Sequence, residues 1–294
     1  MLLIGAANTQ ECLEKLCHAF EEAELFFGHG TDNAWDEACW LLETLARRRR
    51  LPTLQLDTLL PAELVAEVAQ LATARIETRK PLAYLLQEAW FCGLSFHVDE
   101  RVLVPRSPFA ELIDHRFETL LRTAPRRILD LCCGSGCIGI ACALAFPEAE
   151  VVLADLSPAA LAVARINVEK HKLGARVQLL ESDLFKAVTG KFDLIVSNPP
   201  YVGAAEYSEL PDEYQREPQL GLLTGNDGLE IPLRILEQAA QFLTEDGLLL
   251  LETGATWPLL DEARPDLPLL WLEFEHGGEG ICAINAEELR AQSR

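Results

Sequence analysis

Hydrophobic residues recur at every third or fourth position through the first third of the chain, which is the spacing of one face of a helix. The pattern predicts helices over residues 11–27, 32–50 and 61–78. Gly28 ends the first helix, and four consecutive arginines close the second, where cations favour the helix dipole. Residues 82–104 are rich in aromatic side chains and predict a linker with a short hairpin.

From about Arg126 the pattern changes to short apolar runs that alternate with helical stretches, which is typical of a parallel α/β sheet. The predicted strands are 128–131, 151–154, 177–180, 194–197 and 247–252, with helices at 138–146, 158–171 and 229–242. Residues 203–226 predict a long polar loop rich in acidic residues.

The last two apolar runs, 269–274 and 280–285, are joined by a short turn that contains two glycines, so we expect an antiparallel pair. The predicted fold class is α/β: a Rossmann-like, mostly parallel sheet with a reversed last strand, plus a small N-terminal helical domain. We divide the chain into a helical domain (1–88), a hairpin with a connecting helix (89–125) and the sheet domain (126–294).

Charge restricts the class of partner. The 294 residues carry 25 Lys and Arg against 46 Asp and Glu, a net charge of −21. Nucleic-acid affinity depends largely on cations that displace counterions, so we expect no direct nucleic-acid specificity and favour a basic protein partner.

The longest apolar run, Cys137–Phe146, is about half of what a membrane-spanning helix needs, and residues 1–6 lack the basic leader of a signal peptide. We therefore expect a cytoplasmic protein without a membrane segment. The nine cysteines include no C-x-x-C pair or zinc-finger spacing, and we interpret them as reduced thiols rather than metal ligands.

The first chemical motif runs from Asp130 to Gly139 between a predicted strand and a predicted helix. It contains Gly134, Gly136 and Gly139 in the G-x-G-x-x-G spacing, which lets a nucleotide approach the main chain. The spacing by itself is compatible with NAD, FAD or S-adenosylmethionine.

Three aspartates stand at the ends of three consecutive predicted strands, where ligands of open α/β sheets bind. Asp130 would repel a pyrophosphate but suits the ammonium and sulfonium groups of S-adenosylmethionine. Asp155 is placed to bind ribose hydroxyls, although it could also cap the helix that starts at Ser157 and Pro158. Asp183 could accept a hydrogen bond from the adenine amino group.

The second motif, Asn198-Pro199-Pro200-Tyr201, follows the fourth predicted strand. The prolines remove two amide donors and leave carbonyl acceptors, and Asn198 offers both an acceptor and a donor to a planar amide or amidine. Tyr201 supplies a flat wall on which such a group can stack.

The glycine loop, the spaced aspartates, Asn-Pro-Pro-Tyr and the reversed last strand together resemble class I S-adenosylmethionine-dependent methyltransferases. Within that fold, Asn-Pro-Pro-Tyr is similar to enzymes that methylate a planar nitrogen: adenine N6 in nucleic acids or the side-chain amide of glutamine in proteins. The helical domain joined by a hairpin resembles the protein glutamine N5-methyltransferases and implies that residues 1–88 recognise the substrate.

Two branches of this family are close to the chain. The release-factor branch carries a Pro-Arg-Pro-Glu-Thr-Glu type of segment before the core, whereas this chain has Val-Pro-Arg-Ser-Pro at 104–108. Together with residues 89–101, that segment resembles the branch that acts on large-subunit ribosomal protein number three, a basic ribosomal partner. Methylation of release factors remains the alternative.

The resemblance implies that Asn198 and a backbone carbonyl of its motif hold the glutamine NH2 in line with the methyl donor. Pro199, Pro200 and Tyr201 complete the implied catalytic residues, and no metal is implied. Many relatives have glycine where this chain has Cys132. The implied residues that bind S-adenosylmethionine are Asp130, Cys132, Gly134, Gly136, Asp155, Leu156, Asp183, Leu184 and Asn198.

Three other interpretations compete with this one. An adenine-N6 methyltransferase of nucleic acid shares the Asn-Pro-Pro-Tyr motif but is disfavoured by the charge of −21. An NAD-dependent dehydrogenase is favoured only by the glycine spacing. A binding module with a relic cofactor site would transfer no methyl group at all.

Overall fold

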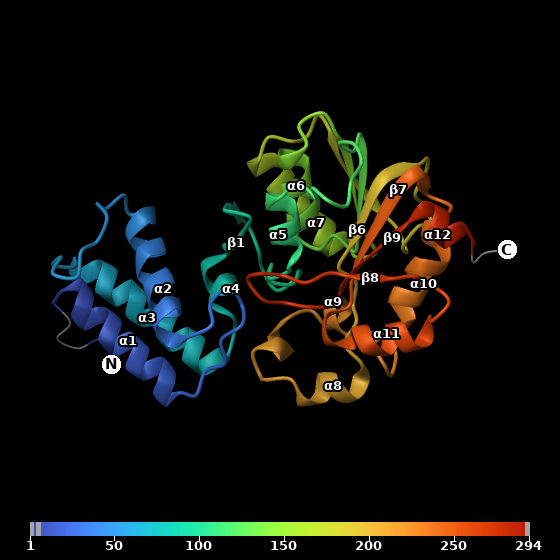
Figure 1. The fold of residues 1–294 in the computed structure, drawn as a ribbon. Helices are drawn as coiled ribbons and strands as arrows, with labels where there is room; N and C mark the ends of the chain where they lie inside the picture. Colours follow the sequence, from blue (N-terminus) through green and yellow to red (C-terminus); the bar gives the residue numbers. More distant parts are fainter. Residues whose placement is uncertain (1–2, 4–6, 292–294) are drawn as a thin grey trace. The chain divides into compact units, whose positions relative to one another are not determined.

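The computed structural model describes residues 3 and 7–291, which form two compact units (Figure 1). The first unit contains residues 1–89 together with 211–216, and the second contains 90–210 together with 217–294. The expectation of an N-terminus without a leader concerns residues 1–6, of which only Leu3 is described. In the described part of the chain, no helix is both long and apolar enough to cross a membrane.

The first unit is helical, with α1 Thr9–Glu22, α2 Ala34–Arg48, α3 Ala62–Thr78 and α4 Leu82–Leu86. Asn8 and Asn33 cap the first two helices by accepting the backbone N–H three residues on. The predicted first helix ended at residue 27, but α1 ends at Glu22 because Glu24 takes a left-handed conformation with φ +49°. The short helix α4 was not predicted.

The segment 211–216 returns the chain to this helical unit and contains the short helix η1 Tyr214–Arg216. Glu213 lies in it, 2% exposed, and its carboxylate pairs with Arg75 at 3.1 Å. Arg75 is 1% exposed and also pairs with Glu37 at 2.7 Å. A buried arginine between two buried carboxylates therefore holds this segment to helices α2 and α3.

The second unit is built on a seven-stranded sheet in the order β5-β4-β3-β6-β7-β9-β8. Neighbouring strands from β5 to β7 are parallel, and β9 is antiparallel to both β7 and β8. The predicted reversed strand is therefore confirmed. The strands are β3 Arg127–Leu131, β4 Glu150–Asp155, β5 Val177–Glu181, β6 Phe192–Ser197, β7 Leu243–Glu252, β8 Leu270–Trp271 and β9 Ile281–Asn285.

Helices cover the sheet, which buries the apolar runs that predicted the strands. α6 packs against β3 and β4, α7 against β4 and β5, and α10 and α12 against β7. Their bounds are α6 Cys137–Ala145, α7 Pro158–Lys170, α10 Glu230–Ala239 and α12 Ala286–Ala291. The remaining elements are β1 Ala89–Phe91, β2 Leu94–Phe96, α5 Phe109–Asp114, α8 Ala204–Glu209, α9 Gln219–Leu222, η2 Gly254–Thr256 and α11 Trp257–Ala263.

The prediction of a long polar loop at 203–226 is wrong in part. The segment contains α8, η1 and α9, and Glu213 and Glu217 are buried within it. Only three of its five acids, Glu206, Glu209 and Asp212, are exposed. The acidic composition predicted exposed side chains, but Glu213 and Glu217 are buried because they pair with Arg75 and Arg106.

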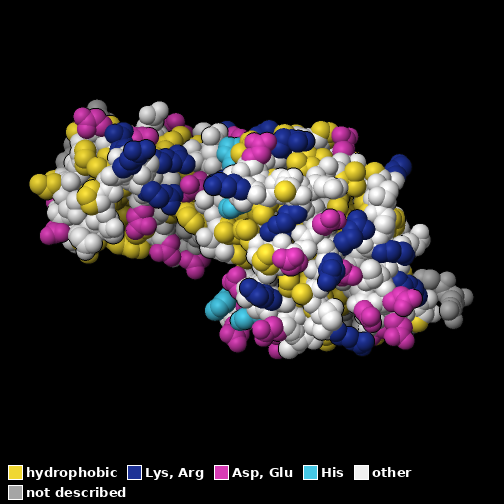
Figure 2. All heavy atoms as spheres, turned by 90° about the horizontal axis from the view of Figure 1, so that it is seen from above, with side chains coloured by type: hydrophobic (Ala, Val, Ile, Leu, Met, Phe, Trp, Pro, Cys, Tyr) yellow, Lys and Arg dark blue, Asp and Glu magenta, His cyan; other side chains and the backbone are white. Residues whose placement is uncertain are grey.

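One face of the molecule carries charges of both signs despite the net charge of −21 (Figure 2). On the face that Figure 2 shows, Lys and Arg side chains are scattered among acidic and hydrophobic ones. No group of three or more His, Cys, Asp or Glu side chains within residues 3 and 7–291 is arranged to hold a metal ion. Burial raises the pKa of Cys133 and Cys142 well above the usual value, so both stay as thiols.

Candidate active site

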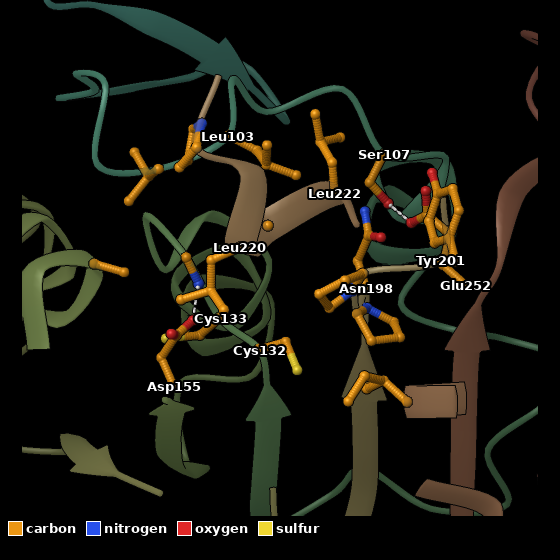
Figure 3. Close-up of a pocket in the computed structure, with 18 of the residues that line it drawn as sticks. Leu103, Ser107, Cys132, Cys133, Asp155, Asn198, Tyr201, Leu220, Leu222 and Glu252 are labelled. Atoms are coloured by element: carbon orange, nitrogen blue, oxygen red, sulfur yellow. Dashed lines mark hydrogen bonds between the residues drawn. The ribbon is translucent and has the colours of Figure 1, made fainter. Parts of the chain in front are cut away.

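A cavity of about 460 Å³ opens at the carboxyl ends of β3, β4, β6 and β7 in the second unit. Along the chain the sheet grows from β3 to β5 in one direction and then continues from β6 in the other, so the cavity lies where the strand order reverses. Figure 3 shows Asp155 at one end of the cavity and Asn198, Tyr201, Ser107 and Glu252 gathered at the other.

The loop after β3 forms one wall. Gly134 has φ +53°, and a Cβ there would meet no atom within 4 Å, so the loop leaves open space beside the cavity. Cys132 also takes a left-handed conformation, with φ +59°. Gly139 serves packing instead, because a Cβ there would lie 2.2 Å from Leu153 Cδ2.

Asp155 organises the same wall. One carboxylate oxygen accepts the N–H of Gly134 at 2.9 Å, and the other accepts the N–H of Ser157 at 2.8 Å. Burial raises its pKa, and these backbone N–H groups oppose the rise. Asp155 lines the cavity as predicted, but it does not cap the next helix: Ser157 is the N-cap of α7 and accepts the Ala160 N–H at 3.2 Å.

The other two aspartates differ in their surroundings. Asp183 lines the cavity and pairs with Arg234 of α10 at 2.7 Å, a partner that sequence reasoning did not find. Asp130 lies behind the loop, 1% exposed, where its Oδ2 accepts the Gly139 N–H at 2.8 Å. Its Oδ1 has no hydrogen-bond partner among the described residues, and burial raises its pKa to about 8.

The Asn-Pro-Pro-Tyr segment leaves β6 beside the cavity, as predicted from its place after the strand. Tyr201 is held closely: its carbonyl accepts the Thr256 hydroxyl at 2.8 Å. A Cβ on Gly228 would lie 2.1 Å from that carbonyl oxygen, and one on Gly254 would lie 2.7 Å from the Tyr201 ring. Sequence reasoning assigned these two glycines no role, yet only glycine fits there.

Glu252, at the end of β7, is a further site residue that sequence reasoning missed. It lines the cavity, is 4% exposed, and accepts the Ser107 hydroxyl at 2.5 Å. Burial raises the pKa of Glu252 to about 7, and Ser107, Arg106, Tyr201 and Asn198 oppose the rise. The only signal in the sequence was the position of Glu252 at the end of a predicted buried strand. That position does not distinguish it from an ordinary strand end, so the sequence assigned it no role.

The segments 101–108 and 217–222 cover the cavity. Glu217 joins them, since its carboxylate accepts the Val104 N–H at 2.9 Å and pairs with Arg106 at 2.7 Å. Leu103 lies 3.0 Å from the place of a Cβ on Gly221, and Figure 3 shows Leu103 and Leu220 above the cavity. Apolar side chains over a polar floor can exclude water from a bound ligand.

Most of the predicted site residues share this one cavity. Asp130 and Gly136 do not line it: Asp130 lies behind the loop, and Gly136 caps the start of α6. The predicted residues that line the cavity are Cys132, Gly134, Asp155, Leu156, Asp183, Leu184, Asn198, Pro199, Pro200 and Tyr201. Their individual roles remain predictions.

Comparison with known proteins decides the family. Residues 112–210 match the family model of the methyltransferase small domain. The ribosomal protein uL3 glutamine methyltransferase of Francisella tularensis is 43% identical over 90% of this chain and 86% of its own length. The enzyme of that name from Neisseria gonorrhoeae is 44% identical over 92% of this chain and 91% of its own. The chain belongs to this methyltransferase family.

The family confirms the predicted methyltransferase activity, with S-adenosylmethionine as cofactor, and excludes the dehydrogenase alternative. A methyltransferase from Pyrococcus furiosus supports the fold alone, with 22% identity, a TM-score of 0.50, and coverage of 73% of this chain and 97% of that one. The class I fold prediction is thus confirmed.

The residues of the cavity fit this cofactor. The open space at Gly134 admits a ligand against the bare backbone, and Asp155 presents a carboxylate to it. Asp130 has an oxygen without a hydrogen-bond partner among the described residues, but it lies behind the loop and does not line the cavity.

Proposed function

We propose that this methyltransferase transfers a methyl group to the side-chain nitrogen (N5) of a glutamine in ribosomal protein uL3. The observation that carries the proposal is Asn198-Pro-Pro-Tyr at the end of β6, facing the cavity of a chain that is 43–44% identical to uL3 glutamine methyltransferases. Asn198 presents an amide to an amide, which is the hydrogen-bonding complement that a glutamine side chain needs.

At the cofactor end, we assign Asp155 to the ribose hydroxyls and Asp183 with Leu184 to the adenine. Asp155 keeps lone pairs beyond the two backbone contacts it makes, and a carboxylate can accept about four hydrogen bonds. S-adenosylmethionine supplies an electrophilic methyl group on a positively charged sulfur. Asp130 lies behind the loop, where burial raises its pKa to about 8, and the positive charge of a bound cofactor would favour its ionised form.

At the substrate end, the nucleophile is the side-chain nitrogen of glutamine. It is a poor nucleophile because its lone pair is delocalised into the amide carbonyl. The Asn198 carbonyl oxygen and a proline carbonyl accept the two N–H groups of glutamine, and Tyr201 supports its plane. These contacts hold the nitrogen in line with the methyl carbon and increase its electron density. In the transfer a new N–C bond would form as the S–C bond breaks, the sulfur would leave as a neutral thioether, and one N–H proton would go to water.

The release-factor alternative would use the same cavity. The 104–108 segment favours uL3, because it departs from the pattern of the release-factor branch and places Arg106 and Ser107 in the cavity wall. The net charge of −21 suits a basic ribosomal protein, and the helical unit is available to recognise it.

The test is methylation of purified uL3 and of purified release factor with labelled S-adenosylmethionine, followed by mass spectrometry of the products. We expect one methyl group on one glutamine of uL3 and none on the release factor, with Asn198→Ala as the inactive control. Label on the release factor alone would assign the chain to the alternative. Label on neither protein would refute both assignments.

A further inference from the structure

We propose that Glu252 is a positioning residue that sets which way the Asn198 amide faces, with its NH2 toward Glu252 and its carbonyl oxygen toward the substrate. This inference rests on the proposed function and names the group that prepares its site.

Strand register places the two side chains together. β6 and β7 run parallel, and Ser197 is the partner of Leu251, so the next residues, Asn198 and Glu252, leave adjacent strand ends side by side. Figure 3 shows both at the same end of the cavity. Asn198 is also one of the groups that oppose the rise in the Glu252 pKa, as expected of a donor near the carboxylate.

An asparagine amide can occupy its place in two orientations related by a half-turn, because oxygen and NH2 are nearly the same size. The half-turn exchanges an acceptor for a donor. If the NH2 of Asn198 faced the NH2 of a substrate glutamine, two donors would meet and no hydrogen bond could form. Catalysis therefore needs something that selects one orientation.

A carboxylate can make this selection because an ionised carboxylate only accepts hydrogen bonds. Facing Glu252, the Asn198 amide must present its NH2, which leaves its oxygen for the cavity. The alternative orientation would place two oxygens together beside a buried negative charge. The cost of that contact in a buried site is far larger than in water.

The carboxylate is itself held in place. The Ser107 oxygen accepts the Phe109 N–H at 3.1 Å, so the hydroxyl proton of Ser107 is left to point at Glu252, 2.5 Å away. Tyr201 is a further hydrogen-bonding partner of Glu252. A carboxylate that already receives several donors is suited to orienting a neighbour rather than to removing a substrate proton.

A polarity-swap experiment tests this role, with kcat and the KM for uL3 and for S-adenosylmethionine measured in each variant. Glu252→Gln keeps the shape but offers both a donor and an acceptor, so it no longer selects the amide orientation. We expect kcat to fall roughly 10- to 100-fold, with little change in the KM for S-adenosylmethionine. Glu245→Gln, at an exposed position of the same strand, is the matched control and should behave as wild type.

The double variant separates orientation from a general structural role. Asn198→Asp alone places two carboxylates together and should be poorly active. In Asn198→Asp with Glu252→Gln, the glutamine donates to the aspartate, which again presents an oxygen to the cavity. We expect this double variant to exceed the Asn198→Asp single variant in kcat. Additive losses would overturn the proposal.

A second measurement does not depend on the protein substrate. The side-chain NH2 of Asn198, assigned in 15N-labelled protein by its loss in Asn198→Asp, should be shifted by Glu252→Gln in the presence of S-adenosylmethionine. An unchanged resonance would overturn the proposal even if uL3 proves not to be the substrate. A shifted resonance with no methylation of uL3 would refute the proposed substrate alone.

Discussion

Replacing Glu213 should destabilise the helical unit, although this residue lies in a stretch whose composition predicts exposed acids. Its Oε1 receives the Phe26 N–H at 3.1 Å, Arg75 at 3.1 Å and Arg79 at 3.3 Å. Arg75 is 1% exposed and its other carboxylate partner is Glu37. Glu213 therefore supplies half of the negative charge that balances a buried arginine.

The contacts set the size of the effect. Glu213→Ala leaves Arg75 with one carboxylate and leaves the Phe26 N–H without its acceptor, and breaking a buried ion pair this way costs about 3–5 kcal/mol. Glu213→Gln keeps one oxygen for these three donors, while it removes the negative charge and replaces the second oxygen by NH2. Since hydrogen bonds to charged groups exceed neutral ones by about 1–1.5 kcal/mol, the glutamine variant should lose about 1–2 kcal/mol.

The measurement is hydrogen exchange of peptides from α2 and α3, which reports the free energy of opening of this unit separately from the sheet. Asp212→Ala, at the exposed neighbouring position, is the control and should stay within about 0.5 kcal/mol of wild type. If Glu213→Ala exchanges as slowly as wild type, the buried ion pair does not support this unit and the reasoning fails.

Acid should reproduce the effect without a mutation. Burial opposes ionisation of Glu213, but the Phe26 N–H and Arg75 outweigh it and hold its pKa below the usual 4.5. Its contribution to stability is therefore present above pH 4.5 and is lost as pH falls through the lowered pKa. As pH falls through this range, the free energy of opening of α3 should decrease more steeply in wild type than in Glu213→Gln, whose residue 213 does not titrate, and the two values should converge.

Further predictions concern the cavity. Asp155→Ala should weaken S-adenosylmethionine binding by about 1–3 kcal/mol in calorimetry, and unchanged affinity would remove Asp155 from the site. Asn198→Ala should lower kcat by about 10²–10³ with unchanged cofactor affinity, and a normal rate would refute the amide-recognition mechanism. Burial raises the pKa of Glu252 to about 7, and Arg106 opposes the rise. We therefore expect kcat to fall as the pH drops below 7, because Glu252 becomes protonated. The Glu252→Gln variant should not show this fall of kcat on the acid side of the pH profile. Neutralising the exposed acids of 203–226 should slow association with uL3 and flatten its salt dependence, and an unaltered salt slope would show that they are only solvated. The acids to change are Glu206, Glu209 and Asp212.

Local patterns in the chain were enough to predict the architecture. Apolar periodicity located the main helices and every strand of the sheet, because a residue's burial in a helix or strand follows the repeat of that element. The glycine loop and Asn-Pro-Pro-Tyr were recognisable because each works through residues adjacent in sequence. The resemblance of these motifs to those of the glutamine methyltransferases predicted S-adenosylmethionine as the cofactor.

The tertiary structure alone decided which charged and polar side chains meet. Arg75 lies 138 residues before Glu213, and Ser107 lies 145 residues before Glu252. Nothing local distinguishes Glu213 from exposed Asp212, or Glu252 from an ordinary strand end. A carboxylate is buried or exposed according to the partner that the fold brings to it, because an unpaired charge cannot leave water at an acceptable cost.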